Sequence, residues 1–397
     1  MKSALNFFSK DRIILYVYLI LSIVISLIFY NQGPRRFNNL IIYRQSFFHL
    51  LDHKNLYLEY PSEYYDIFLY HPAFTVFFSP LSLIPVSLSL ILWTIISSLF
   101  IYYAVKMMPV AEKAKIFLYW FVLIELLNNL HSQQTNSVIA ALGLLTFIFL
   151  EKSKPKRAAL FPLLAFCIKG YGLVFAILFL FYPEKKKYIT YSILWLIALT
   201  LLPLPFTGKD YFLQVYQNWI TCLIDDHKVN FGSSVMGLMK LAMPSFTEND
   251  LSKVQLAGLI LFAITMVYNW IKGTYKTKKQ RLLLLAYTFL WVILFNHTSE
   301  SPTYIIAITG VGLFFVANKS SQNVWWKPLT LFVLAFCILV NRDFFPSSWP
   351  IDETIPPLVV RVLPCLLVWI IVQIQLFIPS KIKNFAMEVE ISRSSSF

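Results

Sequence analysis

The residues best suited to chemistry lie between positions 31 and 71, directly after the first hydrophobic segment. This stretch holds two clusters of carboxylates and many aromatic side chains between apolar sequences. Asp66 is the first candidate for a catalytic base, because it lies a few residues before the chain becomes apolar again at Pro72. A carboxylate at the edge of a bilayer is costly unless it is used or paired. The other carboxylate candidates, in order, are Glu300, Glu63 and Asp52.

An aromatic belt with solvated carboxylates is the competing interpretation of this stretch, since Trp and Tyr gather at membrane interfaces. Asp66 would then pair with a cation such as Arg44 and only position the loop. The functional interpretation assigns the aromatic side chains to sugar contacts. It also expects Asp66 to be buried beside Tyr64, Tyr65 and Phe68.

Polar residues also stand out in three later parts of the chain. The turn 131–136 consists entirely of side chains that can hydrogen-bond, and His297 with Glu300 forms a second pairing of imidazole and carboxylate. Lys169 lies between two apolar segments, where it either snorkels to the headgroups or binds a phosphate at the membrane surface. Glu125 lies deep in an apolar segment and needs a partner, for which we expect a structural pairing.

The elements that must position these residues are membrane helices. The 397 residues are 58% hydrophobic and 14% charged, against about 25% charged in soluble domains. Apolar segments near the ~20 residues of a membrane span recur throughout. We therefore expect one domain, 1–397, an all-α integral membrane bundle of about twelve segments. They are 13–30 (an uncleaved first span), 74–105, 114–130, 135–150, 157–168, 172–183, 188–206, 254–272, 281–296, 302–317, 326–341 and 358–378.

Basic residues assign the connections to two sides of a membrane. One set of connections, with both termini, carries about two thirds of the 34 lysines and arginines. The positive-inside rule puts that set in the cytoplasm. We therefore expect a multi-pass protein of the cell membrane with both termini cytoplasmic, including a tail over about 380–397. The connections 31–73, 131–134, 207–253, 297–302 and 341–357 then face outward. The short segments 157–168 and 172–183 return to the side from which they start.

Residues 39–52 have the pattern of an interfacial helix on the outer leaflet. Leu40, Tyr43, Phe47 and Leu51 share one face of that helix. The polar residues Asn39, Gln45, His49 and Asp52 fall elsewhere on the helical wheel.

Together the outward groups offer a carboxylate base, imidazoles, a lysine for phosphate, amides for hydroxyls and aromatic rings for sugar faces. This inventory suits transfer of a sugar from a lipid phosphate carrier to an acceptor hydroxyl outside the cytoplasm. The sequence has neither a glycine-rich phosphate loop nor a D-x-D pair for a metal–nucleotide complex.

The order of short motifs is similar to that of glycosyltransferase family 87, over roughly residues 30–320. The motifs are Tyr43, Asn55-Leu56-Tyr57, Tyr70-His71-Pro72-Ala73-Phe74, Pro80-Leu81-Ser82-Leu83-Ile84-Pro85, Gln134-Thr135-Asn136, Ile168-Lys169 and Ser301-Pro302. The resemblance implies a GT-C architecture with an outward-facing cavity. It also implies an inverting transferase, often a mannosyltransferase, that uses polyprenyl-phosphate sugars and no metal.

One departure from the family pattern affects the choice of base. The family commonly has an acidic residue where this chain has Asn39. An amide cannot take a proton from a hydroxyl, so either another carboxylate has replaced it or the protein is an inactive scaffold for envelope assembly. Asp66 is the replacement that we expect.

The hypothesis from the sequence is a glycosyltransferase that moves mannose or another hexose to a lipid or glycan acceptor, without a cofactor or a metal. Its partners are the polyprenyl-phosphate sugar, the acceptor and membrane lipids, with no nucleic acid. A transporter or flippase for a lipid-linked or small solute is the alternative. Such proteins use charged or glycine-broken helices near the midplane, whereas this sequence offers only Glu125 there and has 11 glycines in total. The expected residues are Asp66, Glu300 and His297 for catalysis, Lys169, Gln134, Asn136 and His71 for the donor, and Tyr43, Asn39, Tyr57 and Tyr70 for the acceptor or sugar.

Overall fold

The computed structural model describes residues 10–226, 231–297, 299–319, 326–340 and 357–378, and these residues form helices with no strand among them. The helices are α2 (Asp11–Gln32), η1 (Pro34–Phe37), α3 (Asn38–Leu51), α4 (Pro72–Ser82), α5 (Val86–Met107), α6 (Glu112–His131), α7 (Asn136–Glu151), α8 (Pro155–Ile168), η2 (Gly170–Phe181), α9 (Lys185–Leu201), α10 (Leu204–Asp226), α11 (Val235–Ala242), α12 (Glu248–Lys272), η3 (Thr274–Lys276), α13 (Lys278–Leu294), η4 (Ser301–Thr303), α14 (Tyr304–Ala317), α15 (Trp326–Val340) and α17 (Pro357–Phe377).

Each apolar segment expected from the sequence is helical, so that expectation is confirmed. By length and composition, α2, α5 and α12 are candidate membrane spans, and α9 with α10 is a fourth, bent by 89°. Four further apolar helices of the described chain are shorter than a full span. The protein is thus an all-helical membrane protein with three to four candidate spans, and a total of about twelve membrane segments stays a prediction.

Proline and glycine define several helix boundaries. Pro72 and Pro155 occupy the first position of α4 and α8, where the missing N–H has no intrahelical partner to lose. Gly273 ends α12 with a φ of 65°, a left-handed conformation that glycine adopts without steric cost. Gly208, also at a φ of 65°, breaks α10 internally. These residues separate the long apolar sequence into individual helices.

Several of the connections rich in basic residues are joined to one another by polar contacts. The carboxylate of Asp11 accepts a hydrogen bond of 2.8 Å from Lys106. Glu151 accepts one of 2.6 Å from Tyr182 and one of 2.5 Å from Arg281. Connections far apart in the sequence are therefore joined as the charge pattern predicted.

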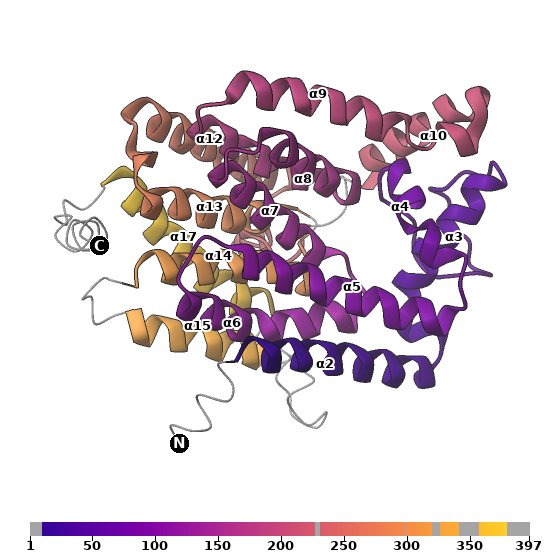
Figure 1. Cartoon of the computed structure of the whole chain (residues 1–397), viewed down its shortest axis with the longest axis horizontal. Coiled ribbons are helices and arrows are strands. Elements are labelled where there is room, and N and C mark those ends of the chain that lie inside the picture. Colours follow the sequence, from indigo (N-terminus) through magenta and orange to yellow (C-terminus); the bar gives the residue numbers. More distant parts are fainter. Residues whose placement is uncertain (1–9, 227–230, 298, 320–325, 341–356, 379–397) are drawn as a thin grey trace, which may run out of the picture.

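Described parts of the other connections meet at the opposite end, where α3, α4 and α10 pack together on the right of Figure 1. The predicted outward connection 341–357 and the predicted tail 380–397 lie outside the described residues, except for Pro357. Asn39 donates to the carbonyl of Ser132 at 2.8 Å, and Lys169 donates to Gln134 at 3.3 Å. Lys169 therefore lies at this end, whereas Tyr182, which follows η2, lies at the basic end. The expectation that 157–168 and 172–183 return to their starting side is confirmed.

Apolar side chains cover the outside of the bundle as expected for contact with lipid. On α2, Leu27 and Ile28 are 48% and 47% exposed. On α12, Ile260 and Ile264 are 51% and 52% exposed. Exposed apolar surface of this kind is typical of contact with a membrane or another protein.

We predict that the end carrying α3 and α10 is extracytoplasmic. Cysteines introduced at the exposed positions Ser62 and Ser245 should react with a membrane-impermeant thiol reagent in intact spheroplasts. A cysteine at Lys154, an exposed residue of the basic end, is the matched control and should react only after permeabilisation. The opposite labelling pattern would reverse the orientation.

Candidate functional site

A pair of tyrosines forms the centre of the site. The hydroxyls of Tyr43, on α3, and Tyr70, just before α4, are 2.8 Å apart, and both side chains are buried. Tyr43 packs edge-on against Phe74 and Trp93, with ring centroids 5.3 Å and 6.0 Å away. The hydroxyl of Tyr57 donates to the carbonyl of Tyr70 at 3.0 Å. Tyr57 thus holds the backbone that carries Tyr70.

Helix α3 confirms most of its predicted face and corrects two residues. Leu40, Tyr43 and Phe47 are buried as predicted, but Leu51 is 43% exposed. Leu51 ends α3, and the chain turns away there, so no element covers it. His49, expected on a polar face, is instead buried, because the following loop folds over it and Glu63 accepts its hydrogen bond at 3.0 Å.

Asp66 lies in the loop between α3 and α4, four residues before Tyr70. The expectation that Asp66 is buried is wrong: Tyr64 and Phe68 point into the core, whereas Asp66 is exposed. The reason is local, since Asp66 has a φ of 76° and its Oδ1 accepts the N–H of Ile67 at 2.8 Å. Aspartate and asparagine tolerate this left-handed conformation better than other non-glycine residues. The turn presents the carboxylate outward.

Lys169 and the Gln134-Thr135-Asn136 turn face one another. Lys169 follows the end of α8 in an extended conformation, and its Nζ donates to Oε1 of Gln134 at 3.3 Å. Tyr171 donates to Oδ1 of Asn136 at 3.1 Å, and Asn136, the first residue of α7, is fully buried. The structure therefore brings together three of the four residues expected to bind a donor.

Burial and nearby carboxylates shift the pKa values of Tyr43, Tyr70 and Lys169. Burial raises the pKa of Tyr70 to about 12, and the carboxylates of Glu300 and Asp66 act in the same direction. Burial also raises the pKa of Tyr43 well above its ordinary value, again with contributions from both carboxylates. Burial lowers the pKa of Lys169, and Glu300 opposes that shift. Glu300 thus contributes to the pKa shifts of both tyrosines and of the lysine.

A buried ion pair holds the turn that carries Glu300. Arg361 of α17 donates to Glu125 at 3.3 Å and to the carbonyl of Ser301 at 2.7 Å. Asn128 donates to the same Ser301 carbonyl at 3.2 Å. The expected structural partner of Glu125 is thereby confirmed. Arg361 itself was missed, although it is the one basic residue of the apolar segment 358–378 and therefore the natural partner for a carboxylate in another span.

The two predicted histidines lie in different surroundings. Nδ1 of His71 accepts the N–H of Ala73 at 3.1 Å and so caps α4. Its ring packs against Trp219 and Phe166, and burial lowers its pKa to about 4. His71 is therefore neutral near pH 7 and has one nitrogen committed to the helix. His297 is partly buried and lies three residues before Glu300.

Asn39 also has a structural contact. Its amide donates to the carbonyl of Ser132, which joins α3 to the turn after α6. Glu63 is paired with His49, and Asp52 forms an ion pair of 3.0 Å with Lys54. Of the four carboxylates considered as a base, Glu63 and Asp52 are thus held in pairs, whereas Asp66 accepts a backbone N–H of its own turn.

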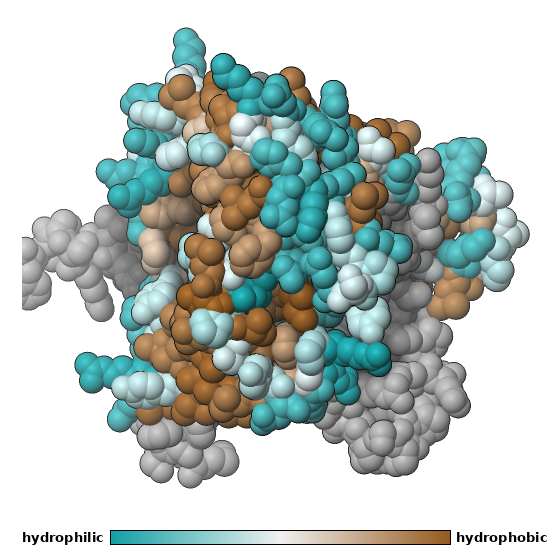
Figure 2. Space-filling view, turned by 90° about the vertical axis from the view of Figure 1, so that its right-hand side faces the viewer, coloured by the Kyte–Doolittle hydropathy of each residue, from teal (hydrophilic) through white to brown (hydrophobic). Residues whose placement is uncertain are grey.

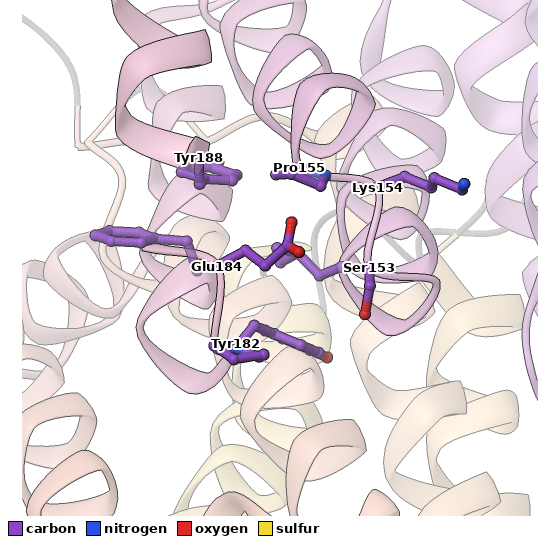
Figure 3. A pocket seen from close by; sticks show the side chains of 9 residues that line it. Ser153, Lys154, Pro155, Tyr182, Glu184 and Tyr188 are labelled. Carbon is purple, nitrogen blue, oxygen red and sulfur yellow. The ribbon is translucent and has the colours of Figure 1, made fainter. Parts of the chain in front are cut away.

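Figure 2 shows the end of the bundle that carries these groups, where strongly hydrophilic residues lie among hydrophobic ones near the middle of the face. By contrast, the pocket in Figure 3 lies at the basic end, and Glu184 reaches into it between Tyr182 and Tyr188. Its cavity volume of about 20 Å³ is enough for a single water and too small for a sugar. Among the described residues, no group of three or more His, Cys, Asp and Glu side chains is arranged to hold a metal ion.

The family model of glycosyltransferase family 87 matches residues 68–299, more than half of the chain. The chain belongs to glycosyltransferase family 87. It is therefore a membrane glycosyltransferase, with a sugar donor and an acceptor as substrates, which decides against the transporter alternative. Among curated proteins, none matches the chain.

The family model matches a shorter part of the chain, residues 68–299, than the roughly 30–320 over which the short motifs were recognised. It includes Tyr70, Gln134, Asn136 and Lys169, but Tyr43 and the Asn55-Leu56-Tyr57 motif precede it. Asp66 and Glu300 lie just beyond its two ends. The tyrosine pair therefore joins a residue inside the match, Tyr70, to one that precedes it, Tyr43.

Proposed function

We propose that the protein transfers mannose or another hexose from a polyprenyl-phosphate carrier to a hydroxyl of an extracytoplasmic lipid or glycan acceptor, with inversion at the anomeric carbon. The main support is the family membership together with the polar contacts that gather at one end of the bundle. Tyr43 bonds to Tyr70, Asn39 joins α3 to the turn after α6, and Lys169 bonds to Gln134 of that turn. An outward-facing cavity of the GT-C type would lie at this end.

The carboxylate of Asp66 is the proposed base. It takes the proton of the acceptor hydroxyl while that oxygen bonds to the anomeric carbon and the bond from that carbon to the phosphate oxygen breaks. The phosphate departs as a stable anion, so no second carboxylic acid is needed to protonate it. Exposure keeps Asp66 accessible to an arriving acceptor, and the Ile67 N–H that it accepts holds the carboxylate in place.

The proposed donor site consists of Lys169, Gln134 and Asn136. The ammonium group of Lys169 neutralises the carrier phosphate, and the hydrogen bond to Gln134 orients it. Tyr43 and Tyr70 provide contacts to the sugar, while Tyr57 and Asn39 hold the surrounding backbone. We leave His71 out of the donor contacts because its neutral ring caps α4.

A transfer assay on the purified protein tests the proposal. We expect hexose transfer from a polyprenyl-phosphate hexose, with mannose and glucose compared, and none from the corresponding nucleotide sugars. The product's anomeric configuration should be opposite to that of the donor. Transfer from nucleotide sugars alone would overturn the proposal.

Replacement of Lys169 by Gln should raise the KM for the lipid donor more than it lowers kcat. A charge contact that is present in both the ground state and the transition state contributes mainly to KM. Lys209→Gln is the matched control, since Lys209 is an exposed lysine at the same end of the bundle. An unchanged KM in Lys169→Gln would leave Lys169 as a snorkelling residue.

A further inference from the structure

A groove lies on the flank of the bundle, where α2 ends and α3 begins. Its volume is about 530 Å³, and it is lined mainly by apolar and aromatic side chains. Binding sites for small ligands typically have volumes of about 300–1,000 Å³. The lining residues that matter for the argument are Tyr30, Ile41, Arg44, Gln45, Phe48 and Val86.

Helix α3 separates this groove from the tyrosine pair. Ile41, Arg44, Gln45 and Phe48 follow the i, i+3, i+4, i+7 spacing of a single helix face and line the groove. Tyr43 belongs to another face, which packs into the core. The groove is therefore distinct from the proposed sugar site, although the same helix forms a wall of both.

An exposed apolar stripe leads along α2 into the groove. Its residues alternate in spacings of four and three, which places them on one face of the helix. Tyr16, Ile20, Ile23, Leu27 and Tyr30 are 55%, 58%, 37%, 48% and 48% exposed. The last of them, Tyr30, lines the groove. A hydrocarbon chain lying along this stripe would end with its headgroup in the groove.

The polar part of the groove is suited to a phosphate. One nitrogen of the half-buried Arg44 donates to the carbonyl of Leu81 at 2.5 Å, and a guanidinium has five N–H donors. Arg35 and Arg36 lie in η1 beside the groove. Arginine binds phosphate in a bidentate manner. Arg35 also lies over the ring of Tyr65 at 5.6 Å. Basic residues are disfavoured in outward connections, so three arginines at this corner mark it as a site for an anion.

We infer that the groove binds an anionic phospholipid of the outer leaflet, with the phosphate at Arg44 and Gln45 and an acyl chain along α2. The inference uses the proposed orientation but not the proposed reaction. Bound lipid would also stabilise the loop that carries Asp66, because Asn38 forms two hydrogen bonds, of 2.7 Å and 2.9 Å, with the backbone of Tyr65.

Native mass spectrometry of the detergent-purified protein, titrated with phosphatidylglycerol or phosphatidylcholine, tests this site. The wild type should retain one phosphatidylglycerol more tightly than phosphatidylcholine. Arg44→Gln should weaken phosphatidylglycerol binding by about tenfold or more, as for a lost hydrogen bond to a charged group. Lys54→Gln, which removes an exposed cation from the same outer segment, should bind as the wild type does.

A second variant and a competitor complete the test. Val86→Trp fills the groove and leaves the bond between Arg44 and Leu81 in place, so it should also lose phosphatidylglycerol even if Arg44→Gln fails to fold. Equal binding by the wild type and Val86→Trp would overturn the inference. Displacement of the bound phosphatidylglycerol by stoichiometric polyprenyl phosphate would also overturn it, because the groove would then belong to the carrier lipid.

Discussion

Asp66→Asn is expected to lower the rate of sugar transfer by about 10²–10⁴-fold, the usual contribution of a general base. The variant has the same shape as the wild type but cannot accept the proton. Asparagine tolerates the left-handed φ of 76° at this position, and its side-chain oxygen can still accept the N–H of Ile67. The rate is measured with a polyprenyl-phosphate hexose, and thermal unfolding in detergent is measured on the same preparation.

The competing structural role of Asp66 predicts the reverse result, lost thermal stability with most of the turnover retained. That role assumed an ion pair between Asp66 and Arg44. Arg44 instead donates a hydrogen bond to the carbonyl of Leu81. Asp52→Asn is the matched control, because Asp52 is an exposed carboxylate of the same loop that pairs with Lys54. It should keep near wild-type transfer.

The transfer rate of Glu300→Gln tests whether Glu300, rather than Asp66, is the base. Both carboxylates raise the pKa of Tyr43 in addition to burial, and Glu300 also opposes the lowering of the pKa of Lys169 by burial. Loss of transfer in Glu300→Gln, with transfer retained in Asp66→Asn, would assign the base to the turn before η4.

Arg361→Gln is expected to destabilise the protein by about 3–5 kcal/mol, the cost of removing one partner of a buried ion pair. The side chains of Arg361 and Glu125 are 3% and 1% exposed, so the remaining carboxylate would lie in the core without its cation. Unfolding in detergent of the wild type and of Arg361→Gln measures the difference. Arg281→Gln, which breaks the more exposed pair with Glu151 at the other end, should cost less.

A double variant separates the stability of the ion pair from its effect on the site. Replacing both partners, as in Glu125→Leu with Arg361→Met, should recover much of the stability, because well-packed apolar residues can replace a buried pair. Transfer should remain low, since the carbonyl of Ser301 keeps the bond from Asn128 but loses the shorter one from Arg361, which helps to hold the Glu300 turn. Recovery of both stability and transfer would show that Arg361 does not position Glu300.

The helices, the two ends of the bundle and the family could all be predicted from the amino-acid sequence. Helix formation and membrane insertion depend on local properties, namely the length and composition of an apolar segment. The apolar segments 13–30 and 254–272 therefore appear as α2 and α12. The assignment of each connection to one end of the bundle follows from the number of basic residues in that connection, which is also a local property. The short motifs around Gln134 and Lys169 were enough to indicate the family.

Which side chains are buried, and which of them contact one another, could be seen only in the folded structure. Arg361 reaches Glu125 across 236 positions of the chain, and no periodicity within either helix encodes that contact. His49 is buried because the next loop folds over it, and Asp66 is exposed because a left-handed turn directs it outward. Burial and pairing depend on how separate helices pack, and the free energy of a buried charge is set by neighbours distant in sequence.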